Sequence, residues 1–309
     1  MTQISNNDIG KRVTIRLKDG EGFRDIVGHL KSTTTLVNRH GQLIEFEPTL
    51  IHIRREIKEV PRTATGGAPL SIRIYELEAA MAKTWRAREE ELIDGWLFRA
   101  DLGITKRANS ALVLNQDSKF NDQIDELIDW YRNRNLNPAI ILIPKLHNEL
   151  DIALAERGFE ITHDCFTMVK NCADSIVDFE FQVTDNPSHE WLATQGDQKL
   201  AELFTRSEAK YLSIILEGEI VAAGRVGFAD GWAVLSRIWV KPDQRGKGFG
   251  RKILAALENE SGGHKLALQV ESKNEIAINL YESMGYTTHH IYRIREQRQQ
   301  INLIQDLCC

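Results

Sequence analysis

The chain has 309 residues and a formal net charge of -5, and its 42% hydrophobic and 27% charged residues are ordinary for a globular protein. At this length two or three domains are expected. The negative charge argues against wholesale nucleic-acid binding. No charged-then-apolar leader opens the chain, and no apolar stretch approaches the roughly 18 residues that cross a bilayer. We therefore expect a cytoplasmic protein with neither a membrane nor a nucleic acid as its partner.

The cysteines give no reason to expect metal binding. They form no Cys-x-x-Cys pair, which argues against a zinc site or a disulfide framework. The four residues are Cys165, Cys172, Cys308 and Cys309. In a cytoplasmic protein such thiols stay reduced.

The first sixty residues carry the pattern of small β structure. Val13, Ile15 and Leu17 alternate with polar residues, which is the period of a half-buried strand. Further short apolar runs follow at close spacing, as in a small barrel or sandwich. We therefore predict a β-barrel over residues 1–60, followed by a linker over residues 61–71 that contains prolines and a Gly-Gly pair.

The middle of the chain, residues 72–175, alternates between helix and strand patterns. Helices are predicted over Ile72–Trp85, around Ile124–Tyr131 and over Leu146–Arg157, and strands over Gly95–Arg99, Ser110–Leu114 and Ile140–Ile143. Apolar residues at helical spacing and short buried runs support these assignments. The region therefore predicts an α/β fold.

The last part, residues 176–309, shows a clearer alternation of strand and helix patterns. Strands are predicted over Tyr211–Leu216, Ile220–Gly227, Trp232–Val240, His264–Val270 and Tyr286–Arg295, with helices over Gly248–Asn259 and Asn274–Met284. Two glycine-containing turns separate the first three strands. The predicted order is three strands, a helix, a strand, a helix and a strand.

A glycine-rich loop lies between the third of these strands and the helix that follows. Its sequence is Arg245-Gly-Lys-Gly248-Phe-Gly250. The first N–H groups of a helix lack partners and carry the positive end of the helix dipole, so they attract anions. Glycines let the backbone approach phosphate oxygens, and Arg245 and Lys247 add positive charge. The loop is typical of a pyrophosphate site, although a tight turn is the alternative for such a loop by itself.

A second motif follows downstream, Asn274-Glu-Ile-Ala277-Ile-Asn-Leu-Tyr281-Glu-Ser-Met-Gly285-Tyr. Arg-x-x-Gly-x-Gly followed by Asn-x-x-Ala-x-x-Leu-Tyr-x-x-x-Gly-aromatic, in this order and at this separation, resembles the GNAT superfamily of N-acetyltransferases. The resemblance implies a mixed central sheet flanked by helices. Two of its strands, Ser236–Val240 and Leu266–Val270, would splay apart to admit coenzyme A.

The resemblance also implies a binding site and a reaction. The residues that would bind acetyl-CoA are Ile238, Trp239, Val240, Arg245, Gly246, Lys247, Gly248, Phe249, Gly250, Asn274 and Tyr281. A primary amine would attack the thioester directly, with Tyr281 donating a proton to the departing thiolate. The resemblance does not identify the base: Glu271, Glu217 and Asp230 are carboxylates near the expected slot or solvated surface charges, and Glu271 is the candidate. Tyr281 shares a helical face with Ala277 and Met284, so a packing role is its alternative.

The acceptor amine is open to a small molecule, a peptide or a protein lysine, and the oligomeric state is unknown. The alternative function is a non-catalytic acyl-CoA sensor in which the barrel is the interaction module. A local excess of lysine and arginine in the barrel also fits a protein- or nucleic-acid-binding adaptor, or a solvated face. The chain combines a small front β-barrel, the segments Gly95-Trp-Leu-x-Arg99 and Arg107-Ala-Asn-Ser110, and a terminal His289-His290-x-Tyr292-Arg293 strand. In this layout it is similar to a group of actinobacterial GNAT proteins with an N-terminal SH3-like domain.

The middle segment ends in the same way as the last one. Alignment of Gly158 with Gly285 places Leu154 on Tyr281 and His147 on Asn274. We interpret residues 72–175 as a degenerate GNAT-like half that precedes a catalytic domain over residues 176–309. The alternative is an unrelated α/β segment with one chance match.

Two further groups of polar residues invite a functional interpretation. Arg99, Arg107 and Asn109 either line the acceptor site or bond neighbouring backbone and carboxylates. His289 and His290 are adjacent in a predicted strand, so their side chains are expected on opposite faces. We therefore interpret the histidine pair as structural and expect no shared metal.

Overall fold

The computed structural model describes residues 4–20, 22–38, 42–56, 70–115, 120–171, 177–196 and 199–298. The chain forms two compact units, Met1–Gly67 and Ala68–Cys309. Residues 61–69 of the predicted linker lie outside the described residues. No helix in the described part is long and apolar enough to cross a membrane.

The first unit contains one sheet with the strand order β4-β3-β2-β1-β5. Its strands are β1 (Arg12–Asp19), β2 (Gly22–Leu30), β3 (Thr35–Val37), β4 (Leu43–Glu45) and β5 (Ile51–Glu56), with short 3-10 turns at Asn6–Asp8 and Pro48–Leu50. The alternation in β1 buries Val13, Ile15 and Leu17, as predicted. Among the described residues β4 and β5 are the two edges of this sheet, so a closed, SH3-like barrel stays a prediction.

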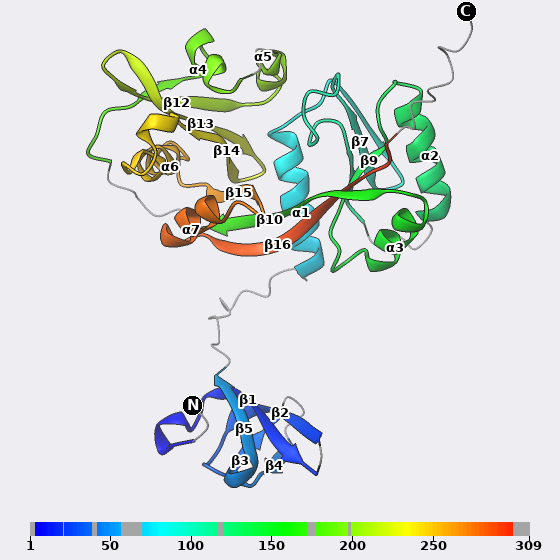
Figure 1. Ribbon diagram of the computed structural model, residues 1–309, viewed down its shortest axis with the longest axis vertical. Coiled ribbons are helices and arrows are strands. Elements are labelled where there is room, and N and C mark those ends of the chain that lie inside the picture. The colour runs from blue at the N-terminus through cyan, green and yellow to red at the C-terminus, as the bar shows by residue number, and fades with distance from the viewer. Residues whose placement is uncertain are drawn as a thin grey trace, which may run out of the picture. The chain divides into compact units, whose positions relative to one another are not determined.

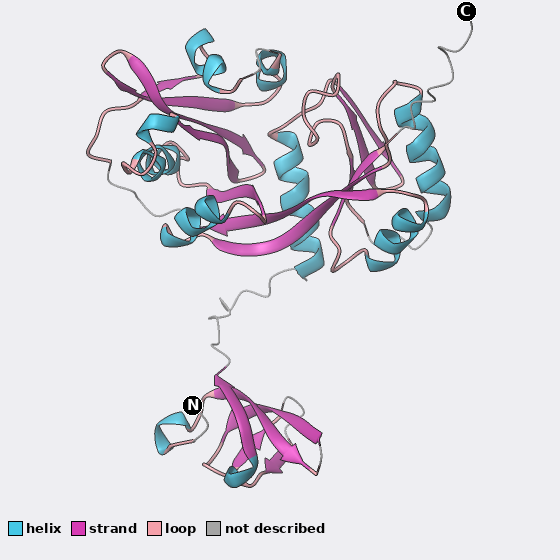
Figure 2. Ribbon diagram, viewed as in Figure 1, coloured by secondary structure: helices cyan, strands magenta, loops and turns pink. Residues whose placement is uncertain are grey.

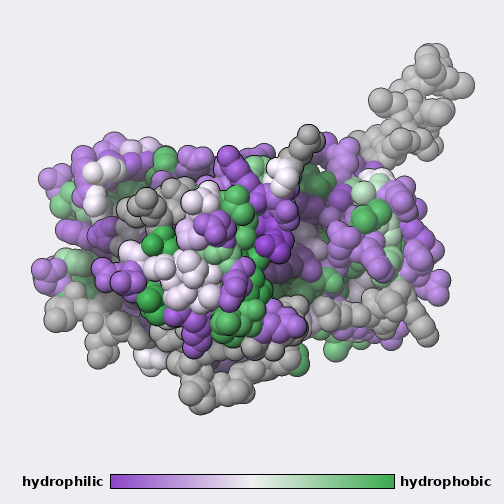
Figure 3. Space-filling model, turned by 90° about the horizontal axis from the view of Figure 1, so that it is seen from below, coloured by the Kyte–Doolittle hydropathy of each residue, from purple (hydrophilic) through white to green (hydrophobic). Residues whose placement is uncertain are grey.

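The surface carries scattered apolar side chains. Figure 3 shows apolar residues interspersed with hydrophilic ones on the face that it draws. In the first unit the exposed large apolar residues are Ile9, Phe23, Val27, Leu43, Leu50 and Ile53. Single exposed apolar residues are normal on a protein surface.

The second unit is built on one sheet of eleven strands, in the order β11-β12-β13-β14-β15-β10-β16-β9-β8-β7-β6 (Figure 1; Figure 2). Its first half comprises α1 (Leu70–Lys83), β6 (Glu89–Ile93), β7 (Trp96–Ala100), β8 (Ala111–Val113), α2 (Phe120–Arg132), β9 (Ala139–Leu142), α3 (Asn148–Glu156) and β10 (Glu160–Lys170). Its second half comprises β11 (Gln182–Thr184), α4 (His189–Thr194), α5 (Leu200–Phe204), β12 (Ala209–Leu216), β13 (Glu219–Ala229), β14 (Trp232–Val240), a 3-10 turn (Pro242–Gln244), α6 (Phe249–Asn259), β15 (Lys265–Glu271), α7 (Glu275–Ser283) and β16 (Thr287–Glu296). The predicted mixed sheet flanked by helices is confirmed.

The two halves exchange their last strands. Each half contributes antiparallel strands followed by a parallel pair, β8 with β9 and β14 with β15. The last strand of the first half, β10, pairs with β15, whereas β16 pairs with β9 of the first half. Because β10 and β16 also pair with each other, the halves are joined through the middle of one sheet.

The junction between β10 and β16 is symmetric. Asn148 and Glu275, which begin α3 and α7, and Glu160 and Thr287, which begin β10 and β16, lie 127 positions apart in both cases. The ladder agrees with this relation. Glu160 pairs with Glu296, and the two equivalent residues 127 positions away, Thr287 and Val169, also pair with each other. The register also slips once at Thr162 and once at His289, which are again related by this shift.

Helices cover both faces of the sheet. In the second half α6 and α7 pack on one face, where Leu254 and Tyr281 share a core with Leu235 and Leu268. On the other face α1 packs through Leu77 against β14 and β15. The helices α4 and α5 lie on that same face, against Ala223 of β13. The first half buries its own core beneath α2 and α3.

Candidate active site

A gap opens between the two parallel strands of the second half. β14 and β15 pair only from Trp232↔Lys265 to Leu235↔Leu268 and diverge beyond that point. A cavity of about 450 Å³ lies between them. It is lined by Thr194, Gln195, Leu235, Ser236, Arg237, Ile238, Trp239, Leu268, Gln269, Val270, Glu271, Asn274 and Tyr281. The structure thus brings Ile238, Trp239, Glu271, Asn274 and Tyr281 together around one cavity, as the resemblance implies.

A β-bulge bends β14 where the gap opens. Ser236 pairs with Arg225 and Trp239 pairs with Ala223, so Arg237 and Ile238 both stand opposite Gly224. Arg237 has a φ of 57°, a conformation that is rare for a residue with a side chain. Its guanidinium donates to Oε1 (2.9 Å) and to the backbone oxygen (3.0 Å) of Gln195. Bulges of this kind re-aim a strand next to a functional site.

The edge of β14 that faces the gap carries backbone donors. Lys241 N donates to Val221 O of β13 at 2.9 Å. Because N–H groups alternate along a strand, those of Val240 and Ile238 point to the other edge, away from β13. This edge can therefore receive an extended ligand by strand addition.

The glycine-rich loop ends at the N-terminus of α6. Gly248 is the N-cap of this helix with a φ of 86°, Gly246 has a φ of 77°, and the first turn contains no acidic residue. A Cβ at Gly246 or Gly248 would meet nothing within 4 Å, so this side of the loop is open. A Cβ at Gly250 would lie 3.2 Å from Leu280 Cδ2, so that glycine lets α6 pack closely on α7. The loop, with exposed Arg245 and Lys247, forms a positively charged cradle for an anion.

The helix α7 positions Asn274 and Tyr281 at the gap. Asn274 is the N-cap of the helix, and its Oδ1 accepts the N–H of Ala277 at 3.2 Å. Tyr281 is buried in the same core as Tyr286, with ring centroids 6.0 Å apart. Burial raises the pKa of Tyr281 to about 12. Tyr281 thus packs in the core, lines the gap, and keeps its proton at neutral pH.

Glu271 and Ser236 are the other groups that could act on a bound molecule. Glu271 lies at the end of β15, with Oε1 3.5 Å from His163 Nε2 and 59% of its side chain exposed, so its charge is well solvated. Ser236 Oγ is buried and has no hydrogen-bond partner among the described residues. The sequence analysis missed Ser236, although a hydroxyl in the apolar run Trp232–Val240 was a detectable signal.

A buried polar network adjoins the gap on the α1 face. Glu78 of α1 is buried and meets His290 Nε2 at 2.9 Å, Thr167 Oγ1 at 3.1 Å and Gln269 Nε2 at 3.2 Å. Burial alone would raise the pKa of Glu78, but the hydrogen bonds from His290 and Thr167 lower it. Glu78 is therefore a carboxylate at neutral pH. Gln269 connects it to the lining of the gap.

The prediction that His289 and His290 lie on opposite faces is wrong. Their Nδ1 atoms are 2.9 Å apart. The physical reason is the register slip in β16, where His289 is the extra residue of a bulge, so the regular alternation fails at this position. Within the described residues no group of three or more potential metal ligands is found.

Arg99 and Asn109 have structural roles. Arg99 is buried and its Nε donates to Ser110 O at 3.0 Å. Asn109 Oδ1 accepts the N–H groups of Asp101 (2.7 Å) and Gly103 (2.9 Å). The interpretation that these side chains bond neighbouring backbone is confirmed for both.

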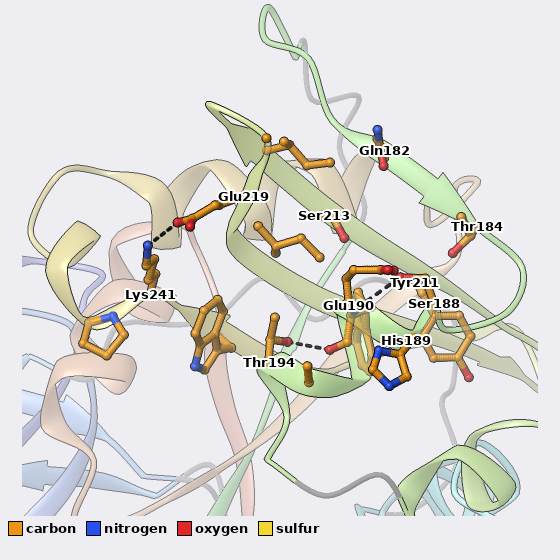
Figure 4. A pocket seen from close by; sticks show the side chains of 17 residues that line it. Gln182, Thr184, Ser188, His189, Glu190, Thr194, Tyr211, Ser213, Glu219 and Lys241 are labelled. Carbon is orange, nitrogen blue, oxygen red and sulfur yellow. Dashed lines mark hydrogen bonds and ion pairs between the residues drawn. The ribbon is translucent and has the colours of Figure 1, made fainter.

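A larger cavity of about 800 Å³ lies beside the gap, between α4 and the edge strands of the sheet (Figure 4). Thr194 and Trp239 line both cavities. Figure 4 shows Lys241 and Glu219, which form an ion pair, at one side of it. Of the residues predicted for the site, only Trp239 lines this larger cavity, so the narrower gap is the candidate active site.

The family of the chain follows from comparison with known proteins. The model of the family described as "Probable histone acetyltransferase Rv0428c C-terminal" matches residues 71–295. The chain belongs to this family. It is therefore an acyltransferase of the GNAT superfamily, as the two motifs implied.

Two curated relatives and one solved structure agree with this assignment. The chain is 27% identical to "Uncharacterized N-acetyltransferase YobR" of Bacillus subtilis over 72% of its length and 98% of the relative. It is 26% identical to "Probable histone acetyltransferase Rv0428c" of Mycobacterium tuberculosis over 93% of its length and 95% of the relative. A GCN5-related N-acetyltransferase from Kribbella flavida matches with a TM-score of 0.59 at 14% identity, covering 75% of this chain and 97% of that one, which shows a shared fold.

Proposed function

We propose that this GNAT protein transfers an acetyl group from acetyl-CoA to a primary amine. The observation that carries the proposal is the open gap between β14 and β15, with Tyr281 at its wall and Asn274 at its rim. The glycine-rich loop at the start of α6 provides an anion cradle next to the same strand. The residues proposed for catalysis, in the gap, thus lie next to those proposed for binding the donor, in the glycine-rich loop.

The donor site uses the backbone more than side chains. The amides of the segment Arg245–Gly250 would receive the pyrophosphate, with Arg245 and Lys247 adding charge. The strand edge at Ile238, Trp239 and Val240 would bond the pantetheine arm, and Asn274 would contact it from α7. The buried, unpartnered hydroxyl of Ser236 and the open side of Gly246 and Gly248 fit a ligand that fills this space.

The residues of the gap have distinct parts in the reaction. Acetyl-CoA supplies the thioester carbonyl that the amine attacks. The N–H of Val240 stabilises the negative charge that develops on that oxygen. Tyr281 protonates the departing sulfur, since its raised pKa keeps the hydroxyl protonated. Glu271 is the candidate for accepting the proton of the amine, because it lines the gap and faces solvent.

Calorimetric titration of acetyl-CoA tests the donor site. The wild type should bind, whereas Gly248→Glu should lose about a hundredfold in affinity, since a carboxylate beside a phosphate costs roughly 3 kcal/mol here. Gly231→Glu is the matched control: Gly231 also has a positive φ, and a Cβ there meets nothing, but it lies at the other end of β14.

The outcomes separate the possible functions. If neither the wild type nor the control binds, the motif is a structural relic and the proposal fails. If the wild type binds acetyl-CoA but transfers acetyl to no amine, the acyl-CoA sensor becomes the better interpretation. Loss of binding in Gly248→Glu together with acetylation of an amine by the wild type supports the proposal.

A further inference from the structure

Three arginines lie on or near the α1 face of the sheet, and one of them differs from the other two. Arg99 and Arg225 are fully buried and donate to the protein: Arg99 to Ser110, and Arg225 Nη2 to Thr84 O at 3.0 Å. Arg107 is half-buried. No described residue forms a salt bridge or a hydrogen bond with its guanidinium. Its Cζ lies over the Trp85 ring, 5.3 Å from the ring centroid.

Trp85 connects Arg107 to one wall of the gap. The indole is buried in a core that also includes Ala223 of β13, and Trp239 packs against this core. Trp239 lines the gap. The indole is fixed by its Nε1, which donates to Thr105 Oγ1 at 3.2 Å. Arg107 therefore lies over a buried aromatic ring whose core extends to Trp239, at one wall of the gap.

The positive charge of Arg107 also acts on two groups on the far side of β15, Tyr292 and Glu78. Burial raises the pKa of Tyr292, and the positive charge of Arg107 opposes that rise. Arg107 is likewise one of the groups that lower the pKa of Glu78, after the hydrogen bonds of His290 and Thr167. Glu78 and Tyr292 lie over β10 and β16, beyond β15 as seen from Trp85. The guanidinium is therefore close enough for its charge to act on Glu78, whose hydrogen-bond partner Gln269 lines the gap.

The nearby carboxylate does not neutralise Arg107 directly. Glu78 already accepts hydrogen bonds from His290, Thr167 and Gln269. The planar guanidinium over the indole presents a fork of N–H donors, which matches a carboxylate in shape and charge. A half-buried cation with a free fork attracts an anion more strongly than a solvated one.

On the basis of the proposed acetyl transfer, we propose that Arg107 binds a carboxylate of the acceptor. The acceptor is then an amine that carries its own carboxylate, as an amino acid does, and Arg107 sets its orientation so that the amine enters the gap. A lysine in a protein tail offers no carboxylate at a fixed short distance from its amine. Arg107 determines specificity and takes no part in the proton transfers.

Paired acceptors test this inference. CoA release from acetyl-CoA would be measured by mass spectrometry with each of a set of L-amino acids, with the matching amino-acid amides, and with a histone-tail peptide. The wild type should prefer the acids. Arg107→Gln should raise KM for the acids about ten- to hundredfold, the worth of a hydrogen-bonded charge pair, and change KM for the amides little.

Two further variants control for charge and for folding. Arg88→Gln removes the same charge from an exposed residue that is paired with Glu202, and should leave KM unchanged. Arg107→Lys keeps the charge without the fork, and should recover part of the affinity for the acids. It also provides a folded variant if Arg107→Gln unfolds, which thermal unfolding would detect.

The inference is overturned if the wild type acetylates the amides or the histone-tail peptide as efficiently as the acids. It is also overturned if Arg107→Gln changes kinetics equally for both members of each pair, since that is a structural effect. Either result leaves the proposed acetyl transfer intact. Failure of acetyl-CoA to bind the wild type in calorimetry would instead remove the proposed function, and this inference with it.

Discussion

The two halves of the second unit share the order of three strands, a helix, a strand, a helix and a strand, but they differ where their parallel strands end. In the second half β14 and β15 diverge, and a cavity opens between them. In the first half the described residues beyond β8 and β9 are joined by polar contacts, and we call this half closed and the second half open. Tyr75 Oη lies 2.8 Å from His147 Nε2 and donates to Asn115 O at 3.1 Å, while His147 Nδ1 accepts the N–H of Ile143 at 3.0 Å.

We propose that residues 72–175 are a second copy of the fold that kept its packing and lost its cofactor site. The shared element order, the strand exchange and the symmetric ladder of β10 and β16 support this proposal. His147 occupies the N-cap position of α3 as Asn274 does that of α7, although only the Asn274 side chain bonds its helix, and Leu154 stands where Tyr281 stands. The loop after β8 contains neither glycine nor arginine, and residues 116–119 of it lie outside the described residues. The difference teaches that the packing of this fold and its chemistry depend on separate residues.

The largest expected effect comes from removing one hydroxyl in the open half. Tyr281→Phe keeps the packing of the ring but removes the proposed acid, so kcat for acetyl transfer should fall about 10²- to 10⁴-fold while the Kd for acetyl-CoA changes little. Steady-state kinetics and calorimetry measure the two quantities. Tyr286→Phe, in the neighbouring core tyrosine, is the control and should keep its kcat. Equal losses in both variants would mean that Tyr281 only packs.

The matching position of the closed half should matter for stability instead. Leu154 is fully buried, so Leu154→Ala should lower the free energy of unfolding by about 2–5 kcal/mol through lost burial and the cavity that remains. Urea titration measures this change. The folded fraction should still bind acetyl-CoA with the affinity of the wild type. Loss of acetyl-CoA binding without a loss of stability would show that the first half has a working site.

Much of the second half could be predicted because its signals are local. The apolar run Trp232–Val240 and the helical spacing from Asn274 predict the strand and the helix, and the two motifs indicate the superfamily. β10 was missed, since His163 and Asp164 interrupt its apolar pattern and its partners β15 and β16 are far away in sequence. The edge strand β6 was missed because its first three residues are glutamates.

Parts of the site could not be predicted, since they arise from long-range packing. The bulge at Arg237 depends on pairing with β13 and on hydrogen bonds to Gln195. The burial of Glu78 against His290 joins residues 212 positions apart in the chain. Neither feature leaves a pattern in a short window of sequence.

His147, at the N-cap position of α3, should have an effect of intermediate size on the free energy of unfolding, and this effect depends on pH. Burial lowers the pKa of His147 to about 4, whereas the unfolded chain keeps the ordinary value of 6.5. Between these values the unfolded chain binds a proton that the folded chain does not. The contribution of His147 is therefore complete above pH 6.5 and is lost as the pH falls through 4, a change of roughly 3 kcal/mol.

The variant His147→Asn introduces the residue that stands at the equivalent position of the second half, Asn274. It should remove the loss of unfolding free energy that His147 causes as the pH falls from 6.5 to 4. Urea titrations at a series of pH values would measure it. His289, whose pKa burial also lowers to about 4, and carboxylates with lowered pKa values such as Glu78 would still contribute a slope. An unchanged pH dependence in the variant would mean that His147 is not the group that resists protonation.

The smallest expected effect tests the symmetry of the halves directly. Gly158 and Gly285 follow α3 and α7 with φ values of 78° and 90°, and a Cβ would lie no closer than 3.8 Å to any neighbour at either position. Alanine at each should therefore cost only the strain of the left-handed conformation, about 1–2 kcal/mol. The two losses, measured by urea titration, should agree. A much larger loss at Gly158 or Gly285 alone would break the structural equivalence of the two helix ends, and with it the simplest argument that both halves derive from one fold.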